Sequence, residues 1–193
     1  QLGRDPLWSL RETYLHGGAT VALGRPAIPI PIGRTVGGTT TVNSGTCFRT
    51  PDRVLDRWNA LGLRVDRGAL DSAFERVEER INVRPVPEKL LGGSSHVIAR
   101  GAEALGLAHG PLKWNIGACQ MSAMCAFGCP TGAKQSMNVT YVPRAIQHGA
   151  TLYSGFEAQR ILGDHGRAQG IVAKPVAGGG ELTIHADVVI SAC

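Results

Sequence analysis

The chain has 193 residues, of which 43% are hydrophobic, so it is long enough to bury a core. Its 20 basic and 15 acidic side chains give a formal charge of +5, but they are scattered, which suits either an anionic cofactor or an ordinary solvated surface. Aromatic residues make up only 5% and do not alternate with basic ones, which argues against nucleic-acid binding. No run of 18 apolar residues occurs, so no membrane span is predicted.

The ends of the sequence suggest an excerpt of a longer chain. The start, residues 1–5, has neither an initiating Met nor a signal-peptide pattern, and residues 187–193 are typical of a buried strand. The five cysteines are an odd number, and a secreted disulfide scaffold would be shorter and richer in cysteine. We therefore expect reduced thiols in a cytoplasmic setting.

The first 36 residues predict a short helix over 7–15 and then an extended proline-rich run over 26–32. Proline lacks the N–H that a strand ladder needs, so this run is predicted to be a connector and not a central strand.

The glycine loop, residues 37–46, follows that connector. Adjacent Gly37 and Gly38 allow a sharp turn and a close approach to a ligand, and the small hydroxyl side chains after them supply donors without bulk. This composition fits a cradle for a flat or phosphorylated ligand, and it also fits an ordinary turn. No Gly-x-Gly-x-x-Gly sequence is present, so the dinucleotide fingerprint is not predicted.

Three helices are predicted over residues 51–61, 71–81 and 95–105. Thr50 is expected to cap the first helix, with Pro51 at its first position, and Trp58 is expected to anchor its apolar face in a core. Leu70, Phe74, Val77 and Ile81 form the apolar stripe of the second.

The cysteine loop, residues 114–137, lacks periodicity, and a loop of this length is usually functional or disordered. Its thiols follow a C-x5-C-x3-C-P pattern, and thiolates select zinc or iron-sulfur clusters. The spacing does not match a zinc finger, and a fourth thiolate would have to come from Cys47 or Cys193. The metal-binding candidates are therefore Cys119, Cys125 and Cys129. The other interpretation is that these cysteines are buried or disulfide-capable and hold an irregular loop, which Lys134 and Ser136 tie to the neighbouring domain.

Beyond this loop, a helix is predicted over 140–148, and strands over 152–162, 168–176 and 182–184. Turn signals at 163–166 and 178–180 predict an antiparallel meander. The six histidines show no ligand spacing, and His165 lies in a predicted turn, so none is a good catalytic candidate.

The glycine loop with its flanks, the cysteine loop and the late strands together resemble the central portion of the flavin-dependent glucose-methanol-choline (GMC) oxidoreductases. The resemblance implies an α/β fold of mixed α+β character, in which part of an FAD-binding Rossmann-like domain carries an antiparallel meander beside a helical substrate-side region. The segments implied are 1–50 (FAD-binding), 51–113 (helical cap), 114–137 (cysteine loop) and 138–193 (FAD-binding helix, meander and buried strand).

Mapped residue by residue, the resemblance places FAD contacts on Gly37, Gly38, Thr39, Asn43, Ser44, Thr46 and Ala158. Thr46 departs from the methionine often found at its position. In some sugar dehydrogenases of the family a similar cysteine loop holds a three-iron cluster, so the resemblance implies FAD as the cofactor and leaves an iron-sulfur cluster as the alternative to structural cysteines. The family's catalytic histidine is expected to lie outside these residues, so no catalytic residue is assigned.

The implied function is FAD-dependent oxidation of the CH–OH group of an alcohol or sugar, with hydride transfer to flavin N5 and an unspecified electron acceptor. The alternatives are an iron-sulfur electron-transfer segment and a non-catalytic remnant. Residues 1–193 alone are expected to bind FAD poorly and to be inactive.

Overall fold

The computed structural model describes residues 2, 3 and 5–192 and divides into two units, Gln1–His148 and Gly149–Cys193. The boundaries of the four predicted segments stay a prediction. All strand pairs among the described residues are antiparallel, so the fold is a mixture of helices and small antiparallel sheets. The Rossmann-like part of the predicted fold is not confirmed. In the same residues, no helix is both long and apolar enough to cross a membrane.

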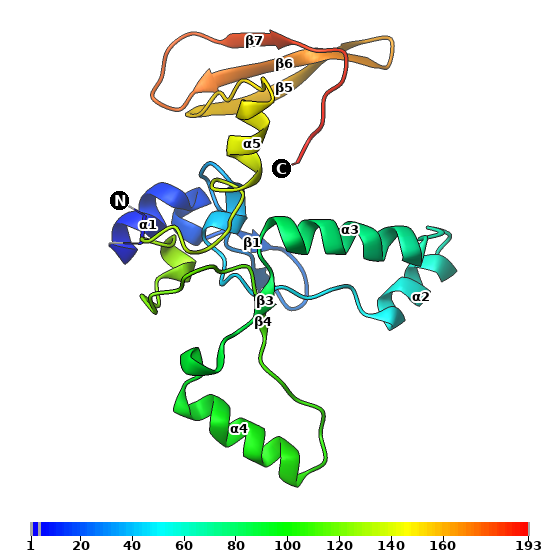
Figure 1. Cartoon of the computed structure of the whole chain (residues 1–193). Helices are drawn as coiled ribbons and strands as arrows, with labels where there is room; N and C mark the ends of the chain where they lie inside the picture. Colours follow the sequence, from blue (N-terminus) through cyan, green and yellow to red (C-terminus); the bar gives the residue numbers. More distant parts are fainter. Residues whose placement is uncertain (1, 4, 193) are drawn as a thin grey trace. The chain divides into compact units, whose positions relative to one another are not determined.

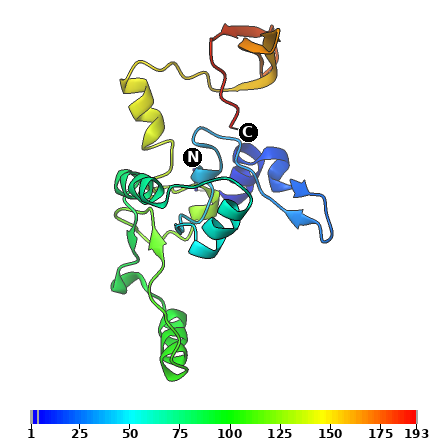
Figure 2. The ribbon, with the colours of Figure 1, turned by 90° about the vertical axis from the view of Figure 1, so that its right-hand side faces the viewer.

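The N-terminal part of the first unit contains a capped helix and a small hairpin. The side chain of Asp5 accepts hydrogen bonds from the N–H groups of Leu7 and Trp8 and so caps the predicted first helix. The proline-rich run contributes only two residues to a two-stranded hairpin, which projects from this unit in Figure 2. The elements are α1 (Pro6–Thr13), the 3₁₀ turn η1 (Leu15–Gly18), β1 (Val21–Ala22), β2 (Ile28–Pro29) and η2 (Gly38–Thr41).

The three predicted helices that follow are confirmed, with shifted ends. Pro51, and not Thr50, is the N-cap of the first, and no side chain caps it. The second begins four residues earlier than predicted because Asp66 caps it through the N–H of Ala69. The remaining elements of this unit are α2 (Asp52–Ala60), α3 (Arg67–Arg80), β3 (Arg84–Pro85), η3 (Glu88–Leu90), α4 (Gly93–Ala104), β4 (Lys113–Trp114), η4 (Cys125–Phe127) and α5 (Tyr141–Gln147).

The buried apolar core of the first unit is small, and most of its residues lie in turns and loops and not on helices. Leu55 on α2 is buried, but Trp58 is 38% exposed, so its prediction as a core anchor is wrong. The helix is only nine residues long and turns its one buried position, Leu55, inward, which leaves the indole at the edge. Figure 1 shows α4 carried on the short β3–β4 pair, and its Val97 and Ile98 are exposed.

The second unit is the predicted antiparallel meander of β5 (Phe156–Asp164), β6 (Arg167–Pro175) and β7 (Leu182–His185), with β6 in the centre. Figure 1 shows the three strands in one sheet, and Val172 and Ala173 of the central strand are buried. Residues 187–192 form no strand, and Val188 and Ile190 are exposed. The predicted buried strand is therefore wrong for these residues: an extended segment becomes a strand only beside a partner, and none of the described strands pairs with it.

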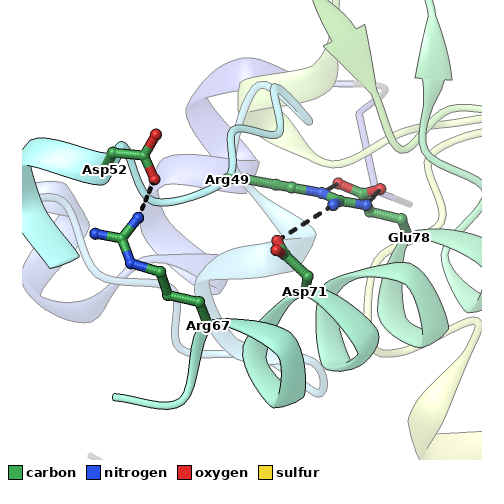
Figure 3. Close-up of polar contacts among 5 residues, drawn as sticks. All are labelled: Arg49, Asp52, Arg67, Asp71 and Glu78. Carbon is green, nitrogen blue, oxygen red and sulfur yellow. Dashed lines mark hydrogen bonds and ion pairs between the residues drawn. The ribbon is translucent and has the colours of Figure 1, made fainter. Parts of the chain in front are cut away.

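Arg49, just after the glycine loop, fastens that loop to α3. Its guanidinium donates two hydrogen bonds to Glu78, Nε to Oε1 at 2.9 Å and NH2 to Oε2 at 2.7 Å. The guanidinium lies over the ring of Phe74, 5.6 Å from its centroid. Its third nitrogen lies 3.6 Å from Asp71 (Figure 3). The same view shows Arg67 of α3 paired with Asp52 of α2. The planar pairing of Arg49 with Glu78 through two hydrogen bonds fixes the orientation of the two side chains as well as the distance between them.

The Arg49 guanidinium lowers the pKa of the Glu78 carboxyl from its ordinary value of 4.5, mainly through these hydrogen bonds. A lowered folded-state pKa stabilises the protein above the ordinary value, and this stability is lost as the pH falls through the folded pKa. We expect Glu78→Gln to lower the midpoint of thermal unfolding by a few degrees at pH 7, and the difference from wild type to shrink as the pH falls below 4.5. Thermal unfolding of both proteins, followed at a series of pH values from about 7 to about 3, measures the difference between their midpoints. A difference that stays constant across that range would contradict it.

Gly170 on β6 has a positive φ of +146°, and a Cβ there would lie 2.1 Å from the carbonyl oxygen of Ile184 on β7. We expect Gly170→Ala to destabilise the meander by more than about 2 kcal/mol because the backbones of β6 and β7 would have to separate. Gly180→Ala is the matched control, since nothing lies within 4 Å of its added Cβ, and we expect its effect to stay within about 0.5 kcal/mol. Denaturant titration of both variants gives the comparison, and equal losses would refute this account of Gly170.

Candidate functional site

The two glycines that begin the glycine loop are both left-handed, with φ of +89° at Gly37 and +57° at Gly38, but for different reasons. A Cβ on Gly37 would lie 2.7 Å from the N of Asn138 and 2.6 Å from Oγ1 of Thr41, so internal packing excludes any side chain there. A Cβ on Gly38 would meet nothing within 4 Å. The backbone of Gly38 therefore borders open space, where another molecule can approach it closely.

The three threonines after the glycines bind mainly their own loop and its neighbour. Thr39 Oγ1 accepts the N–H of Gly33 at 3.0 Å, and Thr41 Oγ1 donates to the carbonyl of Val36 at 2.9 Å. Thr40 Oγ1 accepts the N–H of Met137 at 3.1 Å. These hydroxyls therefore hold the shape of the loop, and of the three only Thr39 is exposed.

The second half of the glycine loop exposes polar side chains. Asn43 and Ser44 are exposed, and Asn43 Oδ1 accepts the N–H of Gly45 at 3.1 Å, which leaves its amide nitrogen as the atom that can donate to a ligand. Ser44 Oγ lies 3.5 Å from Oγ1 of the half-buried Thr46. Six of the seven predicted cofactor residues thus share one continuous loop. The seventh, Ala158, lies on β5 of the second unit, and its role stays a prediction.

A short irregular ladder joins the glycine loop to the cysteine loop. The N–H of Asn115 donates to the carbonyl of Gly45 at 3.0 Å, and the N–H of Gln135 donates to the carbonyl of Asn115 at 2.8 Å. Asn115 is buried, and its Oδ1 has no hydrogen-bond partner among the described residues. That oxygen lies 2.9 Å from where a Cβ on Gly45 would be, so Gly45 too must stay a glycine.

Two buried donors lie beneath the glycine loop, Tyr14 and Lys134. The hydroxyl of Tyr14 contacts the carbonyls of Val42, at 3.1 Å, and of Ala126. The ammonium of Lys134 donates to the carbonyls of Asn43, at 2.6 Å, and of Cys125, at 2.8 Å. The predicted tie between Lys134 and the segment before the helices is therefore present. Ser136 is also buried, and its hydroxyl donates to Oδ1 of Asn138 at 2.6 Å.

Sequence reasoning missed Tyr14, Asn115 and Asn138 in this arrangement. Each lies far along the chain from the glycine loop and belongs to no motif that would single it out. For Lys134 the sequence predicted the tie, but its burial, at 1% exposed, had no signal in the sequence.

The thiols of the cysteine loop are half-buried and differ from one another. Burial raises the pKa of Cys125. Burial acts in the same direction on Cys129, but hydrogen bonds from the Thr131 hydroxyl and from backbone N–H groups outweigh it, so the pKa of Cys129 lies below its ordinary value. Its Sγ is 3.4 Å from Oγ1 of Thr131.

The predicted iron-sulfur site at Cys119, Cys125 and Cys129 is not supported. Within residues 2, 3 and 5–192, no group of three or more His, Cys, Asp or Glu side chains is arranged to hold a metal ion. The loop turns through η4 between Cys125 and Phe127, and the spacing in the sequence does not by itself aim the three thiols at one centre. Cys193, one of the two proposed fourth ligands, lies outside the described residues.

Comparison with known proteins assigns the chain to a family. Residues 10–193 match the family described as GMC oxidoreductase. The chain is 40% identical over 182 residues to an uncharacterized GMC-type oxidoreductase of Mycobacterium tuberculosis, a match that covers 93% of the chain and 29% of that protein. It is 35% identical to a GMC-type oxidoreductase of Sinorhizobium fredii, over 86% of the chain and 33% of that protein.

A long-chain-alcohol oxidase of Arabidopsis thaliana is 31% identical to the chain, over 95% of the chain and 26% of the oxidase. The chain thus spans about a third or less of the length of these three curated relatives. The family match covers almost all of the chain and includes both the glycine loop and the cysteine loop. This chain therefore belongs to the GMC oxidoreductases, a family of FAD-binding proteins.

Proposed function

We propose that this chain supplies the flavin-contacting segment of an oxidoreductase that oxidises the CH–OH group of an alcohol, with hydride transfer to flavin N5. The observation that carries the proposal is the open backbone at Gly38, in a loop that also exposes Asn43 and Ser44. The family match supports the cofactor class, and the similarity to long-chain-alcohol oxidases supports an alcohol as the donor.

The residues present fit FAD. A side chain at position 38 would fill the space that the backbone borders, so glycine keeps that space free for a flat ring system or a phosphate. The side-chain amide of Asn43 offers a hydrogen-bond donor, while the backbone carbonyl of the same residue accepts a hydrogen bond from the buried Lys134 ammonium. The loop is fixed at both ends, by packing of Gly37 on Asn138 and by the pairing of Arg49 with Glu78.

FAD, when bound, supplies the hydride acceptor, and the protein supplies binding, orientation and electrostatics. In this chain the glycine loop binds and orients, and its buried contacts hold it in shape before any ligand arrives. Such preorganisation reduces the entropy that binding would otherwise cost. None of the six histidines lies in the glycine loop, and we assign no proton transfer to a residue of this chain.

A pair of alanine substitutions tests the role of Gly38. Gly106, in the first unit, has φ of +65° against +57° at Gly38, and a Cβ at either position meets nothing within 4 Å. We expect both substitutions to cost about 1–2 kcal/mol of stability from left-handed strain. In the complete natural polypeptide, only Gly38→Ala should also raise the FAD dissociation constant, at least about tenfold, which is about 1.4 kcal/mol of binding energy.

Flavin absorbance after purification and a fluorescence titration with FAD give the two affinities. Gly106→Ala controls for strain, because it carries the same backbone cost away from the glycine loop. Wild-type FAD affinity in Gly38→Ala, or an equal loss in both variants, would refute this placement of the cofactor.

The substrate class is tested by mixing the flavin-loaded polypeptide with primary alcohols of increasing chain length without oxygen. We expect loss of the flavin absorbance in the blue, with faster reduction by long-chain alcohols than by short ones, because the named oxidase relatives act on long-chain alcohols. A polypeptide that binds FAD but is reduced by no alcohol would show that the assignment of the donor is wrong.

A further inference from the structure

Two consecutive carbonyls of the glycine loop are joined to two consecutive carbonyls of the cysteine loop through the side chains of Tyr14, which follows α1, and Lys134, which belongs to the cysteine loop itself. Tyr14 contacts the carbonyls of residues 42 and 126, and Lys134 those of residues 43 and 125. Val42 is itself buried. We call Tyr14 and Lys134 together the brace. It links the loop that faces the proposed ligand to the loop that carries three thiols.

Lys134 is an unusual side chain to bury. It is 1% exposed, and no Asp or Glu forms an ion pair with it among the contacts of the described residues. Burial lowers the pKa of its ammonium group, and the nearby thiols act in the opposite direction. Lysine is almost never fully buried without compensation, so the two carbonyls provide the stabilisation that keeps it there. Moving either carbonyl away would leave a buried donor without its partner.

Further contacts make the two loops one packed body. The N–H of Met137 donates to Thr40, and Thr41 Oγ1 lies 3.3 Å from Oδ1 of Asn138. Asn138, which packs against Gly37, lies only four positions after Lys134 in the chain. Lys134 is therefore the side chain that links the carbonyl of Asn43 directly to the carbonyl of Cys125.

From this arrangement we infer that Lys134 is a positioning residue for the FAD segment, and that it couples occupancy of the glycine loop to the accessibility of Cys125 and Cys129. The inference rests on the proposed function. Binding and modification at two places that share a structural element influence each other reciprocally: a ligand bound at the glycine loop protects the thiols, and modification of a thiol weakens the binding of that ligand.

The test measures alkylation of each cysteine by iodoacetamide, followed by mass spectrometry, in the complete natural polypeptide with and without FAD. In wild type we expect FAD to slow alkylation of Cys125 and Cys129 about fivefold or more. The quantity compared between variants is the ratio of the alkylation rate without FAD to the rate with FAD. In Lys134→Met, which keeps the length of the side chain but removes its donors, we expect faster alkylation without FAD and a ratio close to one. Lys89→Met, at an exposed lysine, should keep the wild-type ratio.

The ratio separates coupling from simple support, because a purely structural role would lower stability and leave the ratio unchanged. If Lys134→Met does not fold, Tyr14→Phe removes the other half of the brace, and we expect its ratio to lie between wild type and one. A wild-type ratio in whichever of these variants folds would overturn the inference. Wild type that binds FAD without protecting the thiols would overturn the inference alone, whereas wild type that binds no FAD would overturn the proposed function as well.

Discussion

The buried contact between the glycine loop and the end of the cysteine loop is the constraint on which the site depends. Lys134 holds the carbonyl of Asn43, and Asn138 packs so closely on Gly37 that no side chain fits between them. Backbone carbonyls and amides of an irregular loop need partners when they are buried. Here the partners come from residues 134–138, about 90 positions later in the chain. The loop is therefore held by long-range contacts in addition to its one short 3₁₀ element, η2.

The remaining elements of the first unit extend this arrangement outward. Arg49, just after the glycine loop, links that loop to α3 through its two hydrogen bonds to Glu78. Asn115 links the same loop to β4, since its backbone pairs with Gly45 on one side and with Gln135 on the other. The buried apolar core of this unit is small, and these polar contacts add to what holds the loop.

The two adjacent glycines show why a glycine pair is ambiguous in a sequence. Both have left-handed backbone, yet Gly37 is required by packing inside the protein, and Gly38 leaves space beside the loop. A similar division applies to the polar residues: Thr40 and Thr41 serve the loop itself, whereas Asn43 and Ser44 are exposed. In the cysteine loop the spacing suggested a metal centre, but spacing fixes only how far the chain can reach and not where each thiol points.

The sequence by itself determined the local features of this protein. Apolar spacing and glycine turns placed the helices and the meander to within a few residues, because these signals act over one or two turns of chain. The family was also identified from local sequence, because the residues of the glycine loop resemble those of the GMC oxidoreductases. Only the tertiary structure decided what depends on distant contacts: the exposure of Trp58, the burial of Lys134 and the absence of a strand over residues 187–192. A side chain is buried, or a strand forms, only when another part of the chain supplies the partner, and no local pattern records where that partner lies.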